Sequence, residues 1–372
     1  MKRREFLAAG AAAGLVATAR GEGGATRATS ISTSTPASTS NDIAKIPRIT
    51  AATAGEMRDE MLYRKLGATG EEVSAIGMGG AHLGGRNMTD AEAIKLMHEA
   101  IDRGITFMDN CWDYNEGRSE TRMGDALAQS GYRQKAFLMT KIDGRTKQLA
   151  AQQIEESLRR LKTDRIDLMQ HHEVLRFDDP DRIFAEGGAM EALVEAKKAG
   201  KIRFIGFTGH KDPRVHLYML DVAKQHGFHF DTLQCPINVM DAHYRSFSQM
   251  VVPRAMEDKV AVLGMKSIGS GILLKSGVVT APECLHYSLN LPVAVQITGI
   301  DSKKVLDQAF AVVKNFKPMP NAEFATLVGK TRDVAMEGKY ELFKTSTTFD
   351  GTVKHPEWLG GDVDAVKRIL AS

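Results

Sequence analysis

Cysteine is scarce in this sequence, and the arrangement of the few that occur excludes a class of site. The 372 residues include three cysteines, which are Cys111, Cys235 and Cys284. The count is odd and no two of them form a C-x-x-C pair. This argues against a disulfide scaffold and against a zinc or iron–sulfur site built on cysteines alone. The three cysteines fit a chain that folds in a reducing compartment.

The sequence has no large excess of charge of one sign. It also has no long apolar run. The chain has 49 Lys and Arg against 46 Asp and Glu, a formal charge of +3, and the two signs are interspersed. A nucleic-acid binder concentrates positive charge on one surface. No stretch approaches the roughly 18 apolar residues that a membrane span requires. We therefore expect no nucleic-acid partner and no stable membrane span.

Residues 1–19 have the order of an export signal. A charged start with Arg3-Arg4-x-Phe6-Leu7 precedes a run of small apolar residues, and Ala17-Thr18-Ala19 supplies a small-x-small cleavage site. The Arg-Arg core resembles the twin-arginine signal, which implies the twin-arginine translocase as a partner and export of a folded protein. We therefore expect a periplasmic or secreted protein. The alternative is an Ala-rich helical N-terminus.

The composition changes sharply after this signal. The stretch 26–40 holds ten Ser or Thr among fifteen residues and almost nothing apolar. Such a segment cannot bury enough surface to offset its ordering entropy. We predict a disordered tether over residues 20–60, one folded domain over 61–345 and a C-terminal tail over 346–372.

The folded domain alternates short β-rich apolar runs with longer helical patterns, which is typical of βαβ units. The predicted strands are Ala75–Met78, Thr106–Asn110, Phe137–Lys141, Ile166–Gln170, Arg203–Thr208, Thr232–Pro236, Ala261–Lys266 and Ala294–Thr298. The predicted helices include Ala91–Arg103, Ala150–Leu161, Ala189–Lys198, Pro213–His226 and Lys303–Val313.

Eight strands, one per βα unit, predict an α/β fold of the (β/α)8 TIM-barrel type. A doubly wound open sheet would show the same alternation, but no G-x-G-x-x-G follows the first strand to hold a pyrophosphate. Before the first barrel strand, residues 63–74 form two short β patterns around a Gly-containing turn. We expect this hairpin to plug the lower mouth of the barrel.

Chemically active side chains recur at the predicted strand ends, where the active site of such a barrel lies. Asp109 ends the second strand and Tyr114 follows it, Lys141 ends the third, and His172 follows the fourth. Because these strands are neighbours, we expect the four side chains to converge.

These residues and their surroundings resemble the aldo-keto reductase superfamily over roughly residues 62–320. The ordered motifs are Tyr-Arg-x-Leu-Gly near the start, Gly79-Gly80, the Asp-x-x-x-x-Tyr spacing from Asp109 to Tyr114, Gly117-x-Ser119-Glu120, Ser157-Leu158-x-x-Leu161 and Gly200-Lys201-Ile202-Arg203. The resemblance implies a nicotinamide-dependent oxidoreductase that reduces an aldehyde, ketone or sugar-like carbonyl, or runs the reverse reaction. It implies Asp109, Tyr114, Lys141 and His172 as the catalytic residues.

The residue types suit that chemistry. Hydride transfer to a carbonyl carbon leaves charge on oxygen, which needs a proton donor within hydrogen-bond reach. Tyr114 is the expected donor, and we expect the Lys141 ammonium to lower the pKa of this phenol. Asp109 would hold Lys141 in place, and His172 would orient the carbonyl oxygen.

The resemblance also implies a site for NADP or NAD, with departures from the family pattern. Thr208 and Gln234 match positions that bind the nicotinamide carboxamide, but Gly209 replaces the usual Asn and Met265 the usual stacking aromatic. The remaining expected cofactor residues are Lys266, Ser267 and Gly269 for the pyrophosphate, and Gly299, Ser302 and Lys303 after the last strand. The choice between NADP and NAD stays open.

Two other functions stay open at this stage. The altered cofactor positions are compatible with a catalytically idle, cofactor-binding barrel that acts as a recognition module. A metal-dependent hydrolase would use His171, His172, Glu173 and His210, but the first strand end lacks the usual His-x-His. We therefore expect no metal. Cys111 is expected to be a packing residue or a weak redox group.

Overall fold

The computed structural model describes residues 53–129 and 131–360. The predicted signal at 1–19, most of the predicted tether at 20–60 and the end of the predicted tail lie outside the described residues.

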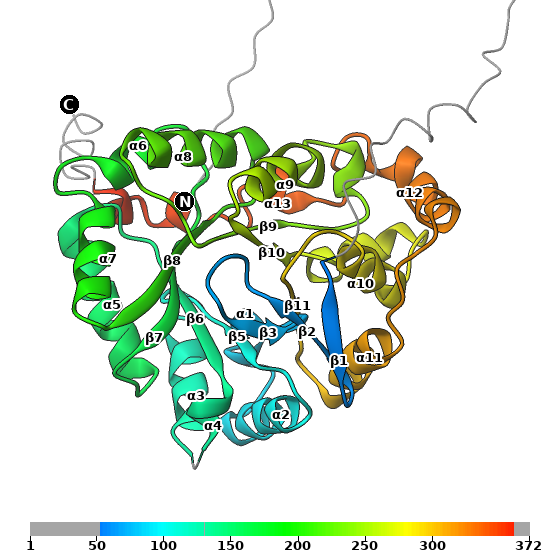
Figure 1. Cartoon of the computed structure of the whole chain (residues 1–372), viewed down its shortest axis with the longest axis horizontal. Coiled ribbons are helices and arrows are strands. Elements are labelled where there is room, and N and C mark those ends of the chain that lie inside the picture. Colours follow the sequence, from blue (N-terminus) through cyan, green and yellow to red (C-terminus); the bar gives the residue numbers. More distant parts are fainter. Residues whose placement is uncertain (1–52, 130, 361–372) are drawn as a thin grey trace, which may run out of the picture. The chain divides into compact units, whose positions relative to one another are not determined.

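Eight parallel strands close into a barrel, with helices around them (Figure 1). The strands are β4 (Ile76–Gly79), β5 (Phe107–Asp109), β6 (Phe137–Ile142), β7 (Ile166–His171), β8 (Ile202–Thr208), β9 (Thr232–Pro236), β10 (Ala261–Met265) and β11 (Val295–Gly299). They follow chain order around the barrel, and β11 pairs with β4 to close it. The predicted (β/α)8 barrel is confirmed, and each predicted strand lies within one residue or two of the observed one.

The helices follow the strands along the chain. They are α1 (Gly80–Leu83), α2 (Asp90–Asp102), α3 (Arg118–Leu127), α4 (Tyr132–Lys135), α5 (Lys147–Arg160), α6 (Asp179–Phe184), α7 (Ala189–Lys198), α8 (Pro213–Gln225), α9 (Phe247–Glu257), α10 (Ala281–Leu289), α11 (Lys303–Lys314) and α12 (Asn321–Ala335). Side-chain caps begin several of them, as at Thr89, where the Thr89 hydroxyl and the Glu92 carboxylate bond each other's backbone N–H. None of the helices described is long and apolar enough to cross a bilayer.

A small antiparallel sheet precedes the barrel and supplies the predicted plug. Strand β2 (Met61–Lys65) pairs with β3 (Glu72–Ser74), and the hairpin buries Leu66 and Val73. These two side chains join inward-facing strand residues such as Phe107 and Leu263 in one apolar cluster. The plug therefore fills the end of the barrel opposite the site and completes its core.

One predicted boundary is wrong. Strand β1 (Gly55–Arg58) pairs with β2 in the register Gly55 to Arg64 and Arg58 to Met61. The tether was predicted to extend to residue 60, so this strand falls inside it. All four β1 residues are exposed, and a strand without a buried face leaves no hydrophobic pattern in the sequence.

The segment after α12 packs onto the carboxyl ends of the strands. It contains α13 (Leu342–Thr345), α14 (Gly351–Lys354) and the 3-10 turn η5 (Pro356–Leu359). The backbone N–H of Arg145 donates to the Trp358 carbonyl at 2.9 Å, and the Trp358 ring packs edge-on against Trp112. The part of the predicted tail that the structure describes is thus ordered against the barrel mouth.

Candidate active site

The four predicted catalytic side chains converge at the ends of β5, β6 and β7. The Lys141 ammonium donates to the Asp109 carboxylate and, at 2.6 Å, to the Asn110 carbonyl. It lies 3.4 Å from the phenol oxygen of Tyr114. The rings of Tyr114 and His172 meet edge-on, with centroids 5.6 Å apart. Parallel register explains this convergence, because Asp109 pairs with Met139 while Lys141 pairs with Gln170.

The expectation that Lys141 lowers the pKa of Tyr114 is not met. Burial and the nearby Asp109 carboxylate instead raise the pKa of the Tyr114 phenol well above 10. The Lys141 ammonium already bonds the Asp109 carboxylate and the Asn110 carbonyl. Its contact with the Tyr114 phenol is the longest of these three. Tyr114 is therefore a protonated phenol at neutral pH, which is the state that a proton donor needs.

His172 lies among three side chains that the sequence analysis did not assign to catalysis. Its Nδ1 atom is 2.8 Å from Asp143 Oδ1, 3.2 Å from Cys111 Sγ and 3.8 Å from Asp113 Oδ1. Burial lowers the pKa of His172 and raises that of Asp143 to about 7. An alternating pattern could have revealed these neighbours, because Asp109, Cys111 and Asp113 are spaced by two, as are Lys141 and Asp143.

A cavity of about 330 Å³ opens beside the catalytic side chains. Asp109 and Tyr114 line it, together with Gln234, Lys266 and other residues that end β4, β9, β10 and β11. The predicted cofactor residues that line this cavity are Gln234, Lys266, Ser267, Gly269 and Gly299.

Gln234, which lines this cavity, carries a buried polar atom without a partner among the described residues. Its side-chain amide bonds Asp109, whereas its Oε1 atom is buried and has no hydrogen-bond partner among the described residues. A buried acceptor without a partner is costly. Thr208, which does not line the cavity, places its hydroxyl 4.0 Å from the sulfur of Met265, which does.

Lys266 is an unpaired cation in the cavity wall. Within the described ranges its ammonium has no hydrogen bond or ion pair, and it faces the Phe349 ring at 4.6 Å from the centroid. Burial lowers its pKa to about 8. Its φ of 59° is in the left-handed region, which is unusual for a residue with a side chain. The unpaired cation and the unusual backbone conformation make Lys266 a candidate ligand-binding residue.

Two glycines of the cavity wall have structural reasons to lack a side chain. Gly269 has a φ of 54°, and a Cβ there would lie 2.3 Å from a methyl carbon of Leu273. A Cβ at Gly299 would lie 2.3 Å from the ring of His82. Both positions keep the cavity open by allowing a close approach of neighbouring side chains.

Ser302 and Lys303 line a second cavity of about 460 Å³, which shares Asp301 with the first. The Ser302 hydroxyl caps α11 by accepting from the Val305 N–H. Lys303 is exposed and its ammonium lies 2.8 Å from Asp307 and 3.0 Å from Glu99. The structure therefore does not bring these two residues to the catalytic cavity, but places them in a cavity that has Asp301 in common with it.

The residues predicted for a metal-dependent hydrolase do not form one metal site in the described part of the chain. His171 is buried in β7, and neither ring nitrogen has a hydrogen-bond partner in the described part of the chain. The Glu173 carboxylate accepts from the backbone N–H groups of Gly351 and Thr352, both at 2.8 Å. His210 bonds the Phe343 carbonyl at 3.0 Å through Nδ1.

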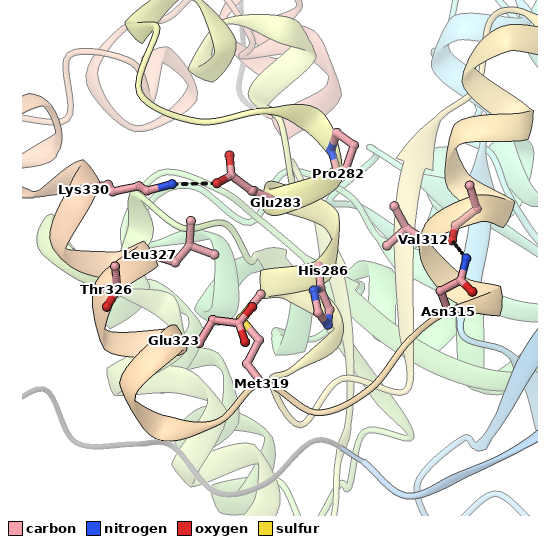
Figure 2. Close-up of a pocket in the computed structure, with 11 residues that line it drawn as sticks. Pro282, Glu283, His286, Val312, Asn315, Met319, Glu323, Thr326, Leu327 and Lys330 are labelled. Atoms are coloured by element: carbon pink, nitrogen blue, oxygen red, sulfur yellow. Dashed lines mark hydrogen bonds and ion pairs between the residues drawn. The ribbon is translucent and has the colours of Figure 1, made fainter.

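A further cavity lies away from the strand ends, between α10, α11 and α12 (Figure 2). It measures about 410 Å³, and its wall includes His286, Met319 and an ion pair of Lys330 with Glu283 at 2.7 Å. It holds no group of the catalytic set, so the cavity at Tyr114 is the candidate active site.

Comparison with known proteins agrees with this geometry. The model of the aldo/keto reductase family matches residues 75–329. The aldo-keto reductase YhdN of Bacillus subtilis is 31% identical over 226 residues, which cover 57% of this chain and 64% of that protein. L-galactose dehydrogenase of Arabidopsis thaliana is 28% identical over 223 residues, 58% of this chain and 67% of that protein. The chain thus spans less than two thirds of the Bacillus relative.

A solved structure shares the fold. The holo form of an aldo-keto reductase from Bacillus halodurans superposes with a TM-score of 0.58 at 24% identity, covering 73% of this chain and 96% of that one.

Proposed function

The chain belongs to the aldo/keto reductase family, and from this premise we propose that it interconverts a carbonyl compound and its alcohol with a nicotinamide cofactor. The observation that carries the proposal is the Tyr114 phenol in the cavity wall, 3.4 Å from the Lys141 ammonium that Asp109 holds. A carbonyl reduction requires a proton donor beside a hydride source, and the cation and carboxylate next to Tyr114 can assist that donor.

The cavity walls fit a nicotinamide dinucleotide. The orphaned Gln234 Oε1 is an acceptor suited to a carboxamide N–H, and the unpaired Lys266 ammonium suits a pyrophosphate oxygen. Asp301 lines both this cavity and the second one, which Ser302 and Lys303 line. We propose that Gln234, Thr208, Lys266, Ser267, Gly269 and Gly299 hold the nicotinamide and phosphate parts, and that Ser302 and Lys303 lie near the adenosine end.

When bound, the cofactor supplies or accepts the hydride. In the reducing direction Tyr114 donates its phenolic proton to the carbonyl oxygen, because burial keeps the phenol protonated. Lys141 lies close enough to stabilise the phenolate that remains, and Asp109 fixes the position of Lys141. His172, edge-on to Tyr114, orients the carbonyl oxygen from the other side.

We propose an aldehyde, ketone or sugar-like carbonyl compound as substrate. The Arabidopsis relative is an L-galactose dehydrogenase, which supports the sugar-like class. The test is a spectrophotometric assay of nicotinamide oxidation and reduction with a panel of aldoses, ketones and aldehydes. Turnover of at least one panel member that is lost in Tyr114→Phe supports the proposal. Binding of nucleotide without turnover of any panel member would favour the recognition module.

Cofactor preference is tested separately. Lys303 and Ser302 could contact a 2′-phosphate, whereas Asp301 could accept from a ribose hydroxyl. Titration of the purified protein with NADP and with NAD decides between them. If the protein prefers NADP, Lys303→Ala weakens NADP binding and leaves NAD binding unchanged. If it prefers NAD, Lys303→Ala does not weaken the binding of NADP more than that of NAD.

We further propose that the twin-arginine signal at 1–19 exports the folded protein with its nucleotide already bound. The ordered segment at the barrel mouth supports retention, because Phe349 covers the Lys266 side chain. Native mass spectrometry of the protein recovered from the periplasm should show a cleaved N-terminus and one bound nucleotide. A nucleotide-free periplasmic protein would contradict retention.

A further inference from the structure

Four side chains with metal-binding donor atoms meet behind the catalytic tyrosine. Cys111 and Asp113 follow β5, Asp143 follows β6 and His172 follows β7. One donor atom from each lies within 4.8 Å of the others. The four come from three consecutive strand ends, so the barrel itself fixes their relative positions.

Four donor-atom separations in this cluster range from 2.8 to 3.8 Å and bracket those around a tetrahedral zinc ion. His172 Nδ1 lies 2.8 Å from Asp143 Oδ1 and 3.2 Å from Cys111 Sγ. Cys111 Sγ lies 3.7 Å from Asp143 Oδ2, and His172 Nδ1 lies 3.8 Å from Asp113 Oδ1. Tetrahedral ligands at zinc distances are about 3.3 to 3.7 Å apart. To reach one ion, the 2.8 Å pair would have to open by about half an ångström, and any pair near the 4.8 Å limit of the cluster would have to close.

The two carboxylates of the cluster form no ion pair with a lysine or arginine of the described residues. Asp143 is fully buried and Asp113 is mostly buried, yet neither pairs with a Lys or Arg in the described ranges; their one ionic partner is His172. Asp113 Oδ1 is buried and accepts no hydrogen bond from any described residue. Two such carboxylates facing each other are costly without a cation between them.

The cations nearby are engaged elsewhere. The Lys141 ammonium is held by Asp109 and the Asn110 carbonyl. The Arg145 guanidinium donates to the backbone carbonyls of Asp143, His172 and Glu173 and to the Asp179 carboxylate. Neither side chain forms an ion pair with Asp113 or Asp143, although the charges of both lower the pKa of Asp143 and burial outweighs them.

The donor set selects the kind of ion. One thiolate, one imidazole and two carboxylates suit zinc, which takes S, N and O ligands in tetrahedral sites. Magnesium and calcium prefer oxygen ligands alone. We propose that Cys111, Asp113, Asp143 and His172 bind one zinc-class divalent cation.

Four protein ligands leave no open position, so this ion would position His172 rather than activate water. A cation on Nδ1 requires the proton of the neutral ring to be on Nε2, where it can donate to a carbonyl oxygen. Hydrogen bonding of Nδ1–H to Asp143 would leave Nε2 as an acceptor instead. This role rests on the proposed function, whereas the binding of the ion does not. Cys111, Asp113 and Asp143 are then positioning residues.

Metal binding is measured on the purified full-length protein without reference to turnover. Chelator-treated protein is titrated with Co²⁺, and the thiolate-to-cobalt absorption in the near ultraviolet and the ligand-field bands of tetrahedral Co²⁺ are recorded. We expect saturation at one equivalent, displacement by Zn²⁺, and an increase in thermal stability with Zn²⁺. Absence of saturable one-equivalent binding by the wild-type chain overturns the proposal.

Matched variants locate the site. Cys111→Ser should lose the thiolate band, and Asp113→Asn should weaken Co²⁺ binding by more than the roughly 10- to 100-fold that follows loss of a residue that only orients a ligand. The control Cys284→Ser, another buried cysteine, should bind like the wild type. Wild-type binding in both Cys111→Ser and Asp113→Asn overturns the assignment.

One more variant separates this proposal from the proposed function. Tyr114→Phe keeps all four ligands, so it should retain the cobalt spectrum whether or not the chain is a reductase. A reductase without Co²⁺ binding refutes the metal site alone. Retained cobalt binding without any reductase activity in the wild type refutes the function alone. The pH profile of turnover should differ between zinc-loaded and chelator-treated wild type. In Asp113→Asn, the zinc-loaded and chelator-treated samples should give the same profile.

Discussion

The Lys141 ammonium lies 3.4 Å from the Tyr114 phenol oxygen while it is held by the Asp109 carboxylate. Two of these groups are buried and charged, and the third is a partly buried phenol whose pKa is raised well above its usual value. The arrangement keeps a proton on Tyr114 and a cation beside it. Both features lead to measurable consequences.

Replacing the proton donor should remove turnover and leave binding intact. Tyr114→Phe should reduce kcat by about 100- to 10,000-fold, the usual contribution of a general acid, while nicotinamide binding changes little. Steady-state kinetics and fluorescence titration with the cofactor test this. Unchanged kcat in Tyr114→Phe would remove the phenol from the mechanism.

Removing the buried cation should destabilise the fold more than removing both charges. Lys141→Met leaves the Asp109 carboxylate buried without its partner, which should cost about 3 to 5 kcal/mol of unfolding free energy. The double variant Lys141→Met, Asp109→Asn should recover much of this loss, although it stays inactive. Urea unfolding followed by circular dichroism measures both. Equal stability of the single and double variants would show that the pair is not coupled.

Cofactor affinity should depend on pH through Lys266. Burial lowers the pKa of Lys266 to about 8, while the facing Asp109 and Glu173 carboxylates raise it and Lys141 lowers it. Below the folded pKa the ammonium attracts phosphate, and above it the neutral amine does not, so affinity should fall as pH rises through about 8 and somewhat beyond. A bound anion favours the charged form and shifts the midpoint upward.

The matched variants for this effect are Lys266→Met and the exposed Lys275→Met. Loss of a charged hydrogen bond of about 1.5 to 3 kcal/mol should weaken binding by about 10- to 150-fold in Lys266→Met and abolish the pH dependence. Lys275→Met should behave like the wild type. An identical pH profile in Lys266→Met would contradict the assignment of this lysine to the phosphate site.

Acid should destabilise the barrel through buried His216. Its Nε2 atom is 3.2 Å from the Gln234 carbonyl, and burial lowers its pKa from 6.5 to about 4. Between these values the unfolded chain binds a proton that the folded chain does not. The contribution of His216 to the free energy of unfolding is therefore fully present above pH 6.5. It falls by about 3 kcal/mol as the pH drops to about 4.

The variant His216→Gln keeps a polar side chain but does not titrate in this range. Its unfolding free energy at pH 8 should be below that of the wild type because the ring packs between Phe207 and Phe247. The difference between the two proteins should shrink as the pH is lowered to 4.5. Parallel stability curves over this range would show that His216 does not carry the effect.

Much of the fold was predictable because it depends on local patterns. Apolar runs of strand length recur with helical segments between them, and parallel strands joined by helices have few closed arrangements. The positions of Asp109, Lys141 and His172 at strand ends followed from that regularity. Strand β1 was missed because its residues are all exposed, so no burial pattern marks it.

The sequence by itself determined the barrel and its plug, since each follows from periodicity and spacing, and it proposed a set of catalytic residues through the family resemblance of its motifs. The tertiary structure decided what depends on neighbours from different strands. It raised the pKa of Tyr114 where a lower one was expected, left Lys266 and Gln234 Oε1 without partners in the described chain, and placed Cys111, Asp113 and Asp143 around His172. Burial, charge pairing and donor distances arise only when strand ends are brought together in space, and no single stretch of sequence contains them.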